Sequence, residues 1–284
     1  MTALLDQFRQ QGFVLHRGFF PAAEVEALRS AASGVFARVL RQRGLLPDGS
    51  VDEATVATAM VTLFEQDLPT FIQCGKTCQH LVALHRFALQ DRLLLALGEV
   101  GVAEPQICTR PVLYFNNPAL AVTEGHYKTP PHQDWRSMQG SLNAVVAWVP
   151  LVAVDRPLGA LEIIPGSHRH GLADTVPDDW YRRIASSNDA EFIPVEVGAG
   201  DLLLFSAFLI HRSGDNTTDA IRWSCHFRYN DLAEPTYIAR GYPSPYVYRP
   251  DQELVTPDFP TAAELQAACD ALKPGWGHLG VVKE

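Results

Sequence analysis

The sequence contains no long apolar run, no excess of positive charge and few cysteines. No stretch of its 284 residues approaches the roughly 18 apolar residues of a membrane-spanning helix. Its formal net charge of -9 argues against nucleic acid or an anionic membrane surface as the main partner, since both require clustered positive charge. Asp6 and Arg9 interrupt the apolar character of the opening segment, unlike in a signal peptide, so we expect a cytoplasmic protein.

The five cysteines are an odd number in a chain large enough to form its own core, which predicts reduced, mostly buried thiols. Cys74 and Cys78 lack a second Cys or His pair at zinc-finger spacing, so no structural zinc is expected there. With 47% hydrophobic and 19% charged residues, the whole chain 1–284 is expected to form one domain.

The first hundred residues have mainly helical periodicity. Helices are expected over 4–11, about 21–43 and about 80–97, with a strand over 12–15. In the second of these helices, apolar residues recur at the i, i+3, i+4, i+7 spacing of one buried stripe. This helical part, about 1–100, should therefore pack on a sheet.

From about 106 to 235 the chain consists of short β-branched and aromatic runs separated by Gly, Pro, Asn and Asp. This pattern predicts an antiparallel sandwich or jelly roll. The expected fold class is α+β, a double-stranded β-helix (jelly roll, cupin-like) with N-terminal helices packed on the larger sheet. Residues 178–189 are expected to form an inserted loop or short helix, and the tail 236–284 contains a short helix around 262–272.

One triplet, His132-Gln133-Asp134, places two potential metal ligands two residues apart. Such a triplet can arise by chance, but on a strand its first and third side chains share a face, and a third ligand must then come from a neighbouring strand. His211 follows the apolar strand 201–210, at a turn where a barrel rim would lie. Two imidazoles and one carboxylate can hold Fe(II) on one face and leave three positions open for a chelating cosubstrate and dioxygen.

The strand after His211 alternates in polarity. Its apolar members are Ile221, Trp223, Cys225 and Phe227, and its polar members are Arg222, Ser224, His226 and Arg228. The polar face is either exposed to solvent or, if helices cover the apolar face, it lines a cavity. In the second case Arg222 can bind the distal carboxylate of a dicarboxylate cosubstrate, and His226 and Arg228 become candidate substrate contacts.

Around these residues the sequence resembles the phytanoyl-CoA dioxygenase family of Fe(II)- and 2-oxoglutarate-dependent oxygenases. The segment 161–171, LEIIPGSHRHG, is similar to the family's most recognisable strand and turn, and 211–216 followed by Arg222 is similar to its distal-histidine signature. The segment 12–29, GFVLHRGFFPAAEVEALR, resembles the family's opening strand and helix. The resemblance covers roughly 10–235.

The resemblance implies three iron ligands: His132, Asp134 and His211. It also implies that Arg222 binds the C5 carboxylate of 2-oxoglutarate and that Ser213 supports it with a hydroxyl group. Further positions match the lining of the cosubstrate pocket, namely Gln133 and Trp148 and, more weakly, Tyr114 and Asn116. Because Asp134 is present where the related halogenases carry a small residue, hydroxylation is favoured over halogenation.

Candidate substrate contacts lie on both sides of the triplet. The segment 125–131 is rich in turn formers and is either a flap, in which Lys128 could meet an anionic substrate, or a solvated loop. Trp135 and Arg136 follow the triplet and suit a small polar, even acidic, molecule better than a long acyl chain. Hydrogen bonding to backbone carbonyls, and not metal binding, is expected of three other histidines: His126, His168 and His170.

The favoured interpretation is a non-haem Fe(II)- and 2-oxoglutarate-dependent dioxygenase that uses O2, hydroxylates a small polar metabolite or natural-product intermediate and releases succinate and CO2. Two others stay open. A metal-loaded barrel that binds a ligand without turnover would not depend on Arg222 and would form no succinate. A zinc hydrolase could use the same ligands, but it usually needs a general base, and no extra Glu flanks the 132–134 triplet.

Overall fold

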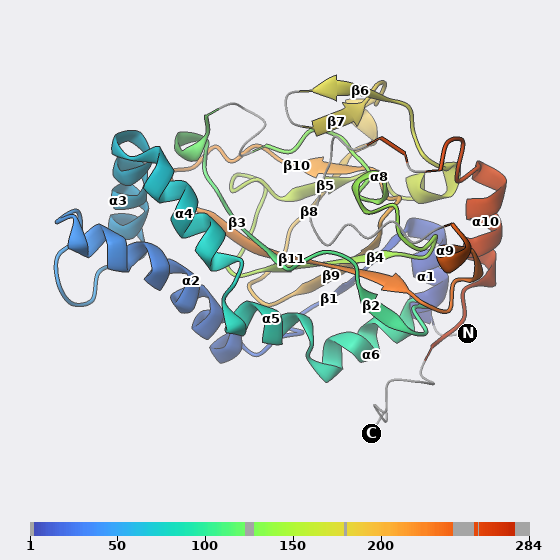
Figure 1. The fold of residues 1–284 in the computed structure, drawn as a ribbon, viewed down its shortest axis with the longest axis horizontal. Helices are drawn as coiled ribbons and strands as arrows, with labels where there is room; N and C mark the ends of the chain where they lie inside the picture. Colours follow the sequence, from blue (N-terminus) through green and yellow to red (C-terminus); the bar gives the residue numbers. More distant parts are fainter. Residues whose placement is uncertain (1–2, 123–127, 179–180, 241–252, 255, 276–284) are drawn as a thin grey trace.

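The structure, a computed structural model, describes residues 3–122, 128–178, 181–240, 253–254 and 256–275 (Figure 1). It combines N-terminal helices with antiparallel sheets, which agrees with the predicted α+β class. Within the described residues, no helix is both long enough and apolar enough to cross a bilayer.

Six helices occupy most of the first hundred residues: α1 (Ala3–Gln11), α2 (Ala22–Gln42), α3 (Glu53–Gln66), α4 (Leu68–Cys78), α5 (Val82–Ala88) and α6 (Asp91–Glu99). The predicted continuous helix over 80–97 is wrong, because Gln90 adopts an extended conformation (φ -67°, ψ 136°) and separates α5 from α6. Helices α3 and α4 were not predicted. Each begins at an aspartate, Asp52 or Asp67, whose side chain accepts a hydrogen bond from a backbone N–H of the first turn.

The larger sheet has the strand order β1-β9-β4-β11-β2, with β3 also paired to β11, and all of its pairs are antiparallel. Its strands are β1 (Phe13–His16), β2 (Pro105–Ile107), β3 (Val112–Asn116), β4 (Val145–Pro150), β9 (Leu202–Ser206) and β11 (Arg222–Asp231). The helices pack on one face of this sheet, as predicted (Figure 1). There Phe36 of α2 meets Phe115 of β3 and Trp223 of β11, with ring centroids 5.1 and 6.5 Å apart.

A smaller sheet, in the order β10-β5-β8, faces the other side of the larger one (Figure 1). Its strands are β5 (Leu161–Ile163), β8 (Ile193–Val195) and β10 (His211–Ser213). A second hydrophobic cluster joins the two sheets, with Val146 and Phe205 from the larger sheet and Ile163 and Val195 from the smaller one. Arg222, His226 and Arg228 of β11 point from the larger sheet toward this same interior.

A hairpin of β6 (Thr175–Asp178) and β7 (Tyr181–Ile184) takes the place of part of the loop or short helix predicted over 178–189. That prediction is wrong for 181–184, which form β7 and pair with β6, whereas 185–188 lie outside any helix or strand, as expected of a loop. The backbone N–H of Ile184 donates to the carbonyl of Pro131 across 2.8 Å. The hairpin is therefore attached to the segment immediately before His132.

The remaining elements are short: η1 (Pro118–Leu120), α8 (Trp135–Met138), η2 (Ser167–His170), η3 (Asp189–Glu191), α9 (Pro235–Ala239) and α10 (Ala262–Ala271). Helix α10 confirms the predicted C-terminal helix, and Thr261 begins it with a capping box in which its side chain and that of Glu264 each bind the other's backbone N–H. All five cysteines are free and buried, as predicted.

Candidate metal and cosubstrate site

Three potential metal ligands meet at one point between the two sheets. One ligand atom each from His132, Asp134 and His211 lies within 4.8 Å of the other two, and all three residues are buried. The backbones of His132 and His211 pair in an isolated antiparallel bridge, with N–H to carbonyl distances of 3.0 and 3.1 Å. This bridge brings together two histidines that are far apart in the sequence.

The backbone around these ligands differs from the expected strands. His132 lies in the single bridge, and Asp134 occupies the turn that begins α8, so the triplet is not on a regular strand. Strand β9 ends at Ser206, and His211 begins β10 in the other sheet. A turn at Asp134 returns its carboxylate toward the imidazole of His132, with 3.7 Å between Oδ1 and Nε2. The two side chains converge as expected, although for a different reason.

Backbone carbonyls fix the orientation of both imidazole rings. Nδ1 of His132 lies 2.8 Å from the carbonyl of Pro130, and Nδ1 of His211 lies 2.9 Å from that of Leu209. Because a carbonyl oxygen only accepts, each Nδ1 carries the proton and each Nε2 keeps its lone pair. Both Nε2 atoms then face Asp134, which is the arrangement that a metal ion requires.

The protonation states also suit a cation. Burial opposes ionisation of Asp134, but the charge of the Arg228 guanidinium holds the pKa of its carboxyl well below the usual range. Burial lowers the pKa of His211 to about 3, so that its imidazole is neutral. A buried carboxylate close to the Nε2 atoms of two imidazoles fits a divalent ion that accepts mixed N and O ligands, such as Fe(II).

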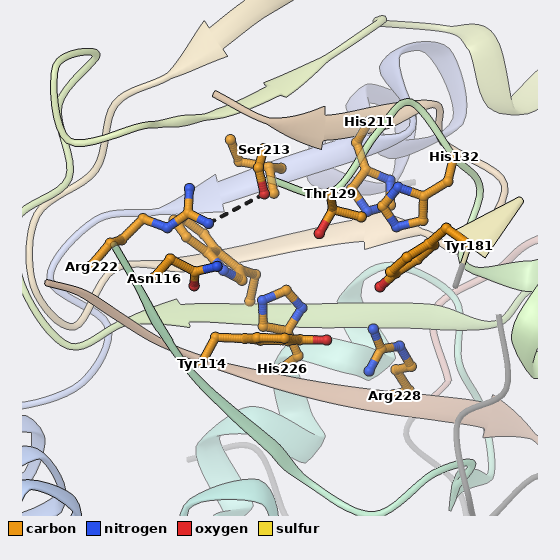
Figure 2. A pocket seen from close by; sticks show the side chains of 12 residues that line it. Tyr114, Asn116, Thr129, His132, Tyr181, His211, Ser213, Arg222, His226 and Arg228 are labelled. Atoms are coloured by element: carbon orange, nitrogen blue, oxygen red, sulfur yellow. Dashed lines mark hydrogen bonds between the residues drawn. The ribbon is translucent and has the colours of Figure 1, made fainter. Parts of the chain in front are cut away.

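Arg222 lies at the other end of the same cavity (Figure 2). Its guanidinium is buried, donates to the carbonyl of Gly159 and lies 3.3 Å from Oγ of Ser213. Burial lowers the pKa of Arg222 to about 10, so that it stays charged near neutral pH. Among the described residues no carboxylate pairs with it, and its Nε has no hydrogen-bond partner. A buried cation in this situation fits the distal carboxylate of 2-oxoglutarate.

The polar face of β11 lines this cavity, so the alternative of a solvent-exposed face is wrong. Arg222, His226 and Arg228 all contribute to the wall, while Trp223 and Cys225 lie in the core beneath the helices. His226 projects into the cavity (Figure 2), and burial lowers the pKa of its imidazole well below the usual value.

Three of the four residues proposed for the cosubstrate pocket lie in this cavity. Tyr114 and Asn116 come from β3, and Trp148 comes from β4. The ring of Tyr114 packs edge-on against His226, with centroids 4.7 Å apart.

Gln133, the fourth, lies elsewhere. Its amide nitrogen donates to the carbonyls of Gly171 and Phe208, at 2.9 and 2.7 Å, and its oxygen accepts from the N–H of Ala173 at 2.8 Å. These bonds fasten the segment after η2 to the metal-binding turn.

The residues predicted to contact the substrate do not lie together in one cavity. Trp135 lies in the core, stacked on Phe208 with 4.9 Å between centroids, and its Nε1 donates to a backbone carbonyl. Lys128 forms an ion pair of 2.5 Å with Asp215 and lines neither cavity beside the metal ligands. Arg228 is within the cavity but donates to Asp134.

Of the two described histidines that were expected to bind backbone carbonyls, His168 does so, and the exposed His170 makes no such hydrogen bond. Nε2 of His168 lies 3.1 Å from the carbonyl of Arg9, and His170 is exposed. His126 and the rest of 123–127, which include part of the predicted flap, lie outside the described residues.

Sequence reasoning missed two residues near the ligands. Tyr181 of β7 lies beside His132, with ring centroids 5.4 Å apart (Figure 2). Arg182 is its neighbour and lines a second cavity with Arg136. No local pattern marks either residue, because their position depends on the hairpin folding back over the metal-binding turn.

Two sheets that enclose two histidines, one carboxylate and a buried arginine define a non-haem metal-dependent oxygenase of the two-histidine, one-carboxylate class. The chain belongs to the phytanoyl-CoA dioxygenase (PhyH) family, whose family model matches residues 8–224. The resemblance inferred from the sequence is thereby confirmed.

Curated relatives cover most of the chain. It is 26% identical over 231 residues to 1-deoxypentalenic acid 11-beta-hydroxylase of Streptomyces exfoliatus, covering 75% of each chain. It is also 26% identical over 289 residues to ectoine dioxygenase of Halomonas elongata, covering 90% of this chain and 79% of the relative.

Solved structures share the fold at lower identity. The epimerase SnoN in complex with Fe3+, alpha ketoglutarate and nogalamycin RO matches with a TM-score of 0.54 and 21% identity, covering 80% of this chain and 82% of the other. The nickel complex of the non-heme monooxygenase ThoJ matches with a TM-score of 0.53 and 19% identity, covering 80% and 77%.

Proposed function

We propose that the protein is an Fe(II)- and 2-oxoglutarate-dependent dioxygenase that hydroxylates a small polar metabolite or natural-product intermediate. The observation that carries the proposal is one cavity that His132 and His211, two of the three converging metal ligands, line at one end. A buried arginine without a carboxylate partner, among the described residues, lines it at the other. A ligand with a chelating group at one end and a carboxylate at the other meets both requirements.

In this proposal His132, Asp134 and His211 hold the iron, and Arg222 with Ser213 holds the C5 carboxylate of 2-oxoglutarate. Bound together, iron and 2-oxoglutarate supply the oxidative chemistry, in which O2 gives one oxygen atom to succinate, with loss of CO2, and the other to the substrate. The chain contributes positioning and exclusion of water rather than acid–base catalysis.

Backbone carbonyls and side chains both perform this positioning. The carbonyls of Pro130 and Leu209 hold the two imidazoles in the tautomer that binds metal. Arg228 holds one carboxylate oxygen of Asp134. Trp148 of β4 and Leu161 of the opposite sheet line the space between the metal ligands and Arg222 with apolar surface.

The relatives support this class of reaction. Those described above are named a hydroxylase and a dioxygenase, and their names indicate small-molecule substrates. SnoN is described as an epimerase, so a similar fold supports more than one outcome. Asp134, the carboxylate that the related halogenases lack, favours hydroxylation in this chain.

The fold supports a finer proposal as well. The two antiparallel sheets that face each other, with the ligands between them, are proposed to be the two walls of a double-stranded β-helix (jelly roll). The helices on the outer face and this barrel are proposed to form the single domain 1–284.

The experiment is anaerobic addition of Fe(II) and 2-oxoglutarate to metal-free protein, recorded as the visible charge-transfer band between iron and cosubstrate. The wild type and the control His168→Gln, a buried histidine outside the site, should show the band. His132→Ala should abolish it, and Arg222→Ala should shift its half-saturation to much higher 2-oxoglutarate. Tight zinc retention without any band would instead favour the zinc hydrolase, and a band without succinate in air would favour the binding module.

A further inference from the structure

A second cavity lies beside the metal ligands. His132 and Tyr181 line both cavities and are, among the described residues, the only two that do. The second cavity contains Arg136 and Arg182 but not Arg222. A group bound there would therefore approach the metal position from a different side than a ligand held by Arg222.

Arg136 belongs to α8, directly after the metal-binding turn. It is buried, with 9% of its surface exposed, and its Nε has no hydrogen-bond partner among the described residues. The one described carboxylate near it is that of Glu253, 3.9 Å from Nη2, which is too long for a hydrogen bond.

Arg182 approaches the same carboxylate from the hairpin. Its Nη1 lies 3.6 Å from Oε1 of Glu253, and its Nε donates to Oγ1 of Thr175 across 3.1 Å. The bond to Thr175 fixes the direction of the guanidinium within the hairpin and leaves its Nη1 near Glu253, and the charge of Arg182 also acts on Arg136.

The two guanidiniums carry like charges that repel each other, and Glu253 compensates them weakly. The side chain of Glu253 is 82% exposed, so water and salt screen both ion pairs. Arg136 is buried and Arg182 is partly exposed, and two such neighbouring arginines are stabilised by an anion that can accept hydrogen bonds from both. The position of Glu253 shows that a carboxylate can reach both groups.

We propose that Arg136 and Arg182 together bind a carboxylate group of the primary substrate and hold that substrate against the face of His132. The inference rests on the proposed function, which requires a substrate beside the metal, and it specifies the substrate class as carboxylic acids. Glu253 occupies the position of the substrate carboxylate when no substrate is bound, and the substrate displaces it.

The test uses acetate and its uncharged analogue acetamide as probes, on protein loaded with Zn(II) and 2-oxoglutarate so that the metal and Arg222 are already engaged. Thermal stabilisation is measured against probe concentration at constant ionic strength. Acetate should stabilise the loaded protein in the millimolar range, and acetamide at the same concentrations should not. Arg136→Gln and Arg182→Gln should each weaken acetate binding by about tenfold or more.

Two further variants separate recognition from general damage. Arg183→Gln removes the neighbouring arginine, which is half-exposed and paired with Asp178 at 3.1 Å, and should leave acetate binding unchanged. Glu253→Gln removes the competing carboxylate and should strengthen acetate binding, by roughly threefold or more, an effect that misfolding cannot produce.

Three results would each overturn the inference. Acetamide could stabilise the protein as much as acetate does, or acetate could fail to stabilise it. Acetate binding could also be unchanged in Arg136→Gln and Arg182→Gln. The iron–2-oxoglutarate band, recorded on the same variants, separates this failure from failure of the proposed function. Arg136→Gln and Arg182→Gln should keep the band. A wild type that shows the band without a preference for acetate would leave the dioxygenase standing and refute the carboxylate site alone.

Discussion

Arg228 of β11 donates a hydrogen bond to the carboxylate of Asp134 across 3.1 Å, and both side chains are buried. The sequence suggested Arg228 as a substrate contact, because it lies on the polar face of its strand. The structure instead places its guanidinium against a metal ligand. A cation there fixes one oxygen of Asp134 and keeps the carboxylate ionised before any metal binds.

Removal of Arg228 should therefore affect the metal-free protein most. Arg228→Met leaves the buried Asp134 charge uncompensated, and we expect the free energy of unfolding to fall by about 3–5 kcal/mol without metal. With saturating Zn(II) the loss should be smaller, because the ion compensates the carboxylate. Urea unfolding with and without Zn(II) measures both values, and an equal loss in the two states would contradict this role.

The contact between Arg222 and Ser213 predicts a graded effect on 2-oxoglutarate binding. Arg222→Met removes the buried charge and should raise the Kd for 2-oxoglutarate at least about 100-fold, equivalent to roughly 3 kcal/mol. Ser213→Ala removes only the hydroxyl 3.3 Å from the guanidinium and should raise it about fivefold, for a loss near 1 kcal/mol. Titration of the iron–2-oxoglutarate band gives both constants. Equal effects of the two variants would show that Arg222 does not contact the cosubstrate.

Gln133 should matter for stability and not for the cosubstrate. Its three hydrogen bonds to backbone groups are lost in Gln133→Ala, which should reduce the free energy of unfolding by about 2–4 kcal/mol. The Kd for 2-oxoglutarate of the folded variant should stay within about twofold of the wild type. A large change in that Kd with unchanged stability would instead support the cosubstrate contact that the sequence suggested.

His168 should make the protein sensitive to acid. Burial lowers the pKa of its imidazole to about 4, against about 6.5 when unfolded, so the unfolded state takes up the proton first. Its contribution to stability is complete above about pH 6.5 and is lost as the pH falls toward 4, by up to about 3 kcal/mol.

The matched variant is His168→Gln, which keeps a donor for the carbonyl of Arg9 but cannot titrate. Urea unfolding between pH 4.5 and 7 should show a shallower loss of stability with acid in this variant than in the wild type. Identical slopes would mean that His168 is not protonated on unfolding.

The identity of the metal ligands could be predicted from the sequence because a two-histidine, one-carboxylate set is chemically specific. The backbone conformation that brings them together could not. His132 and Asp134 converge because one lies in a single β-bridge and the other in a turn. The alternation of side chains along a strand also predicts that they converge, but they do not lie on a regular strand. The cavity-lining role of Arg222 followed from the alternation along β11, since a regular strand of ten residues obeys period two.

Other features of the fold and of the site depend on tertiary contacts, which no short sequence pattern predicts. Helix α3 buries mostly small or flexible residues, among them Ala57 and Met60, so its apolar stripe is weak in the sequence. Trp135 looked like a substrate wall because it follows the triplet, but α8 turns it into the core. Arg182 lies near the site only because the β6–β7 hairpin is hydrogen-bonded to Pro131. The sequence around Arg182 does not predict that contact.

The most direct test of the account is the fate of dioxygen. Protein loaded with Fe(II) and 2-oxoglutarate would be exposed to 18O2, and the succinate formed would be analysed by mass spectrometry against Arg222→Met and His132→Ala. The account predicts succinate that carries one 18O atom, formed by the wild type and strongly reduced in both variants. Succinate without 18O, or equal amounts from wild type and variants, would contradict it.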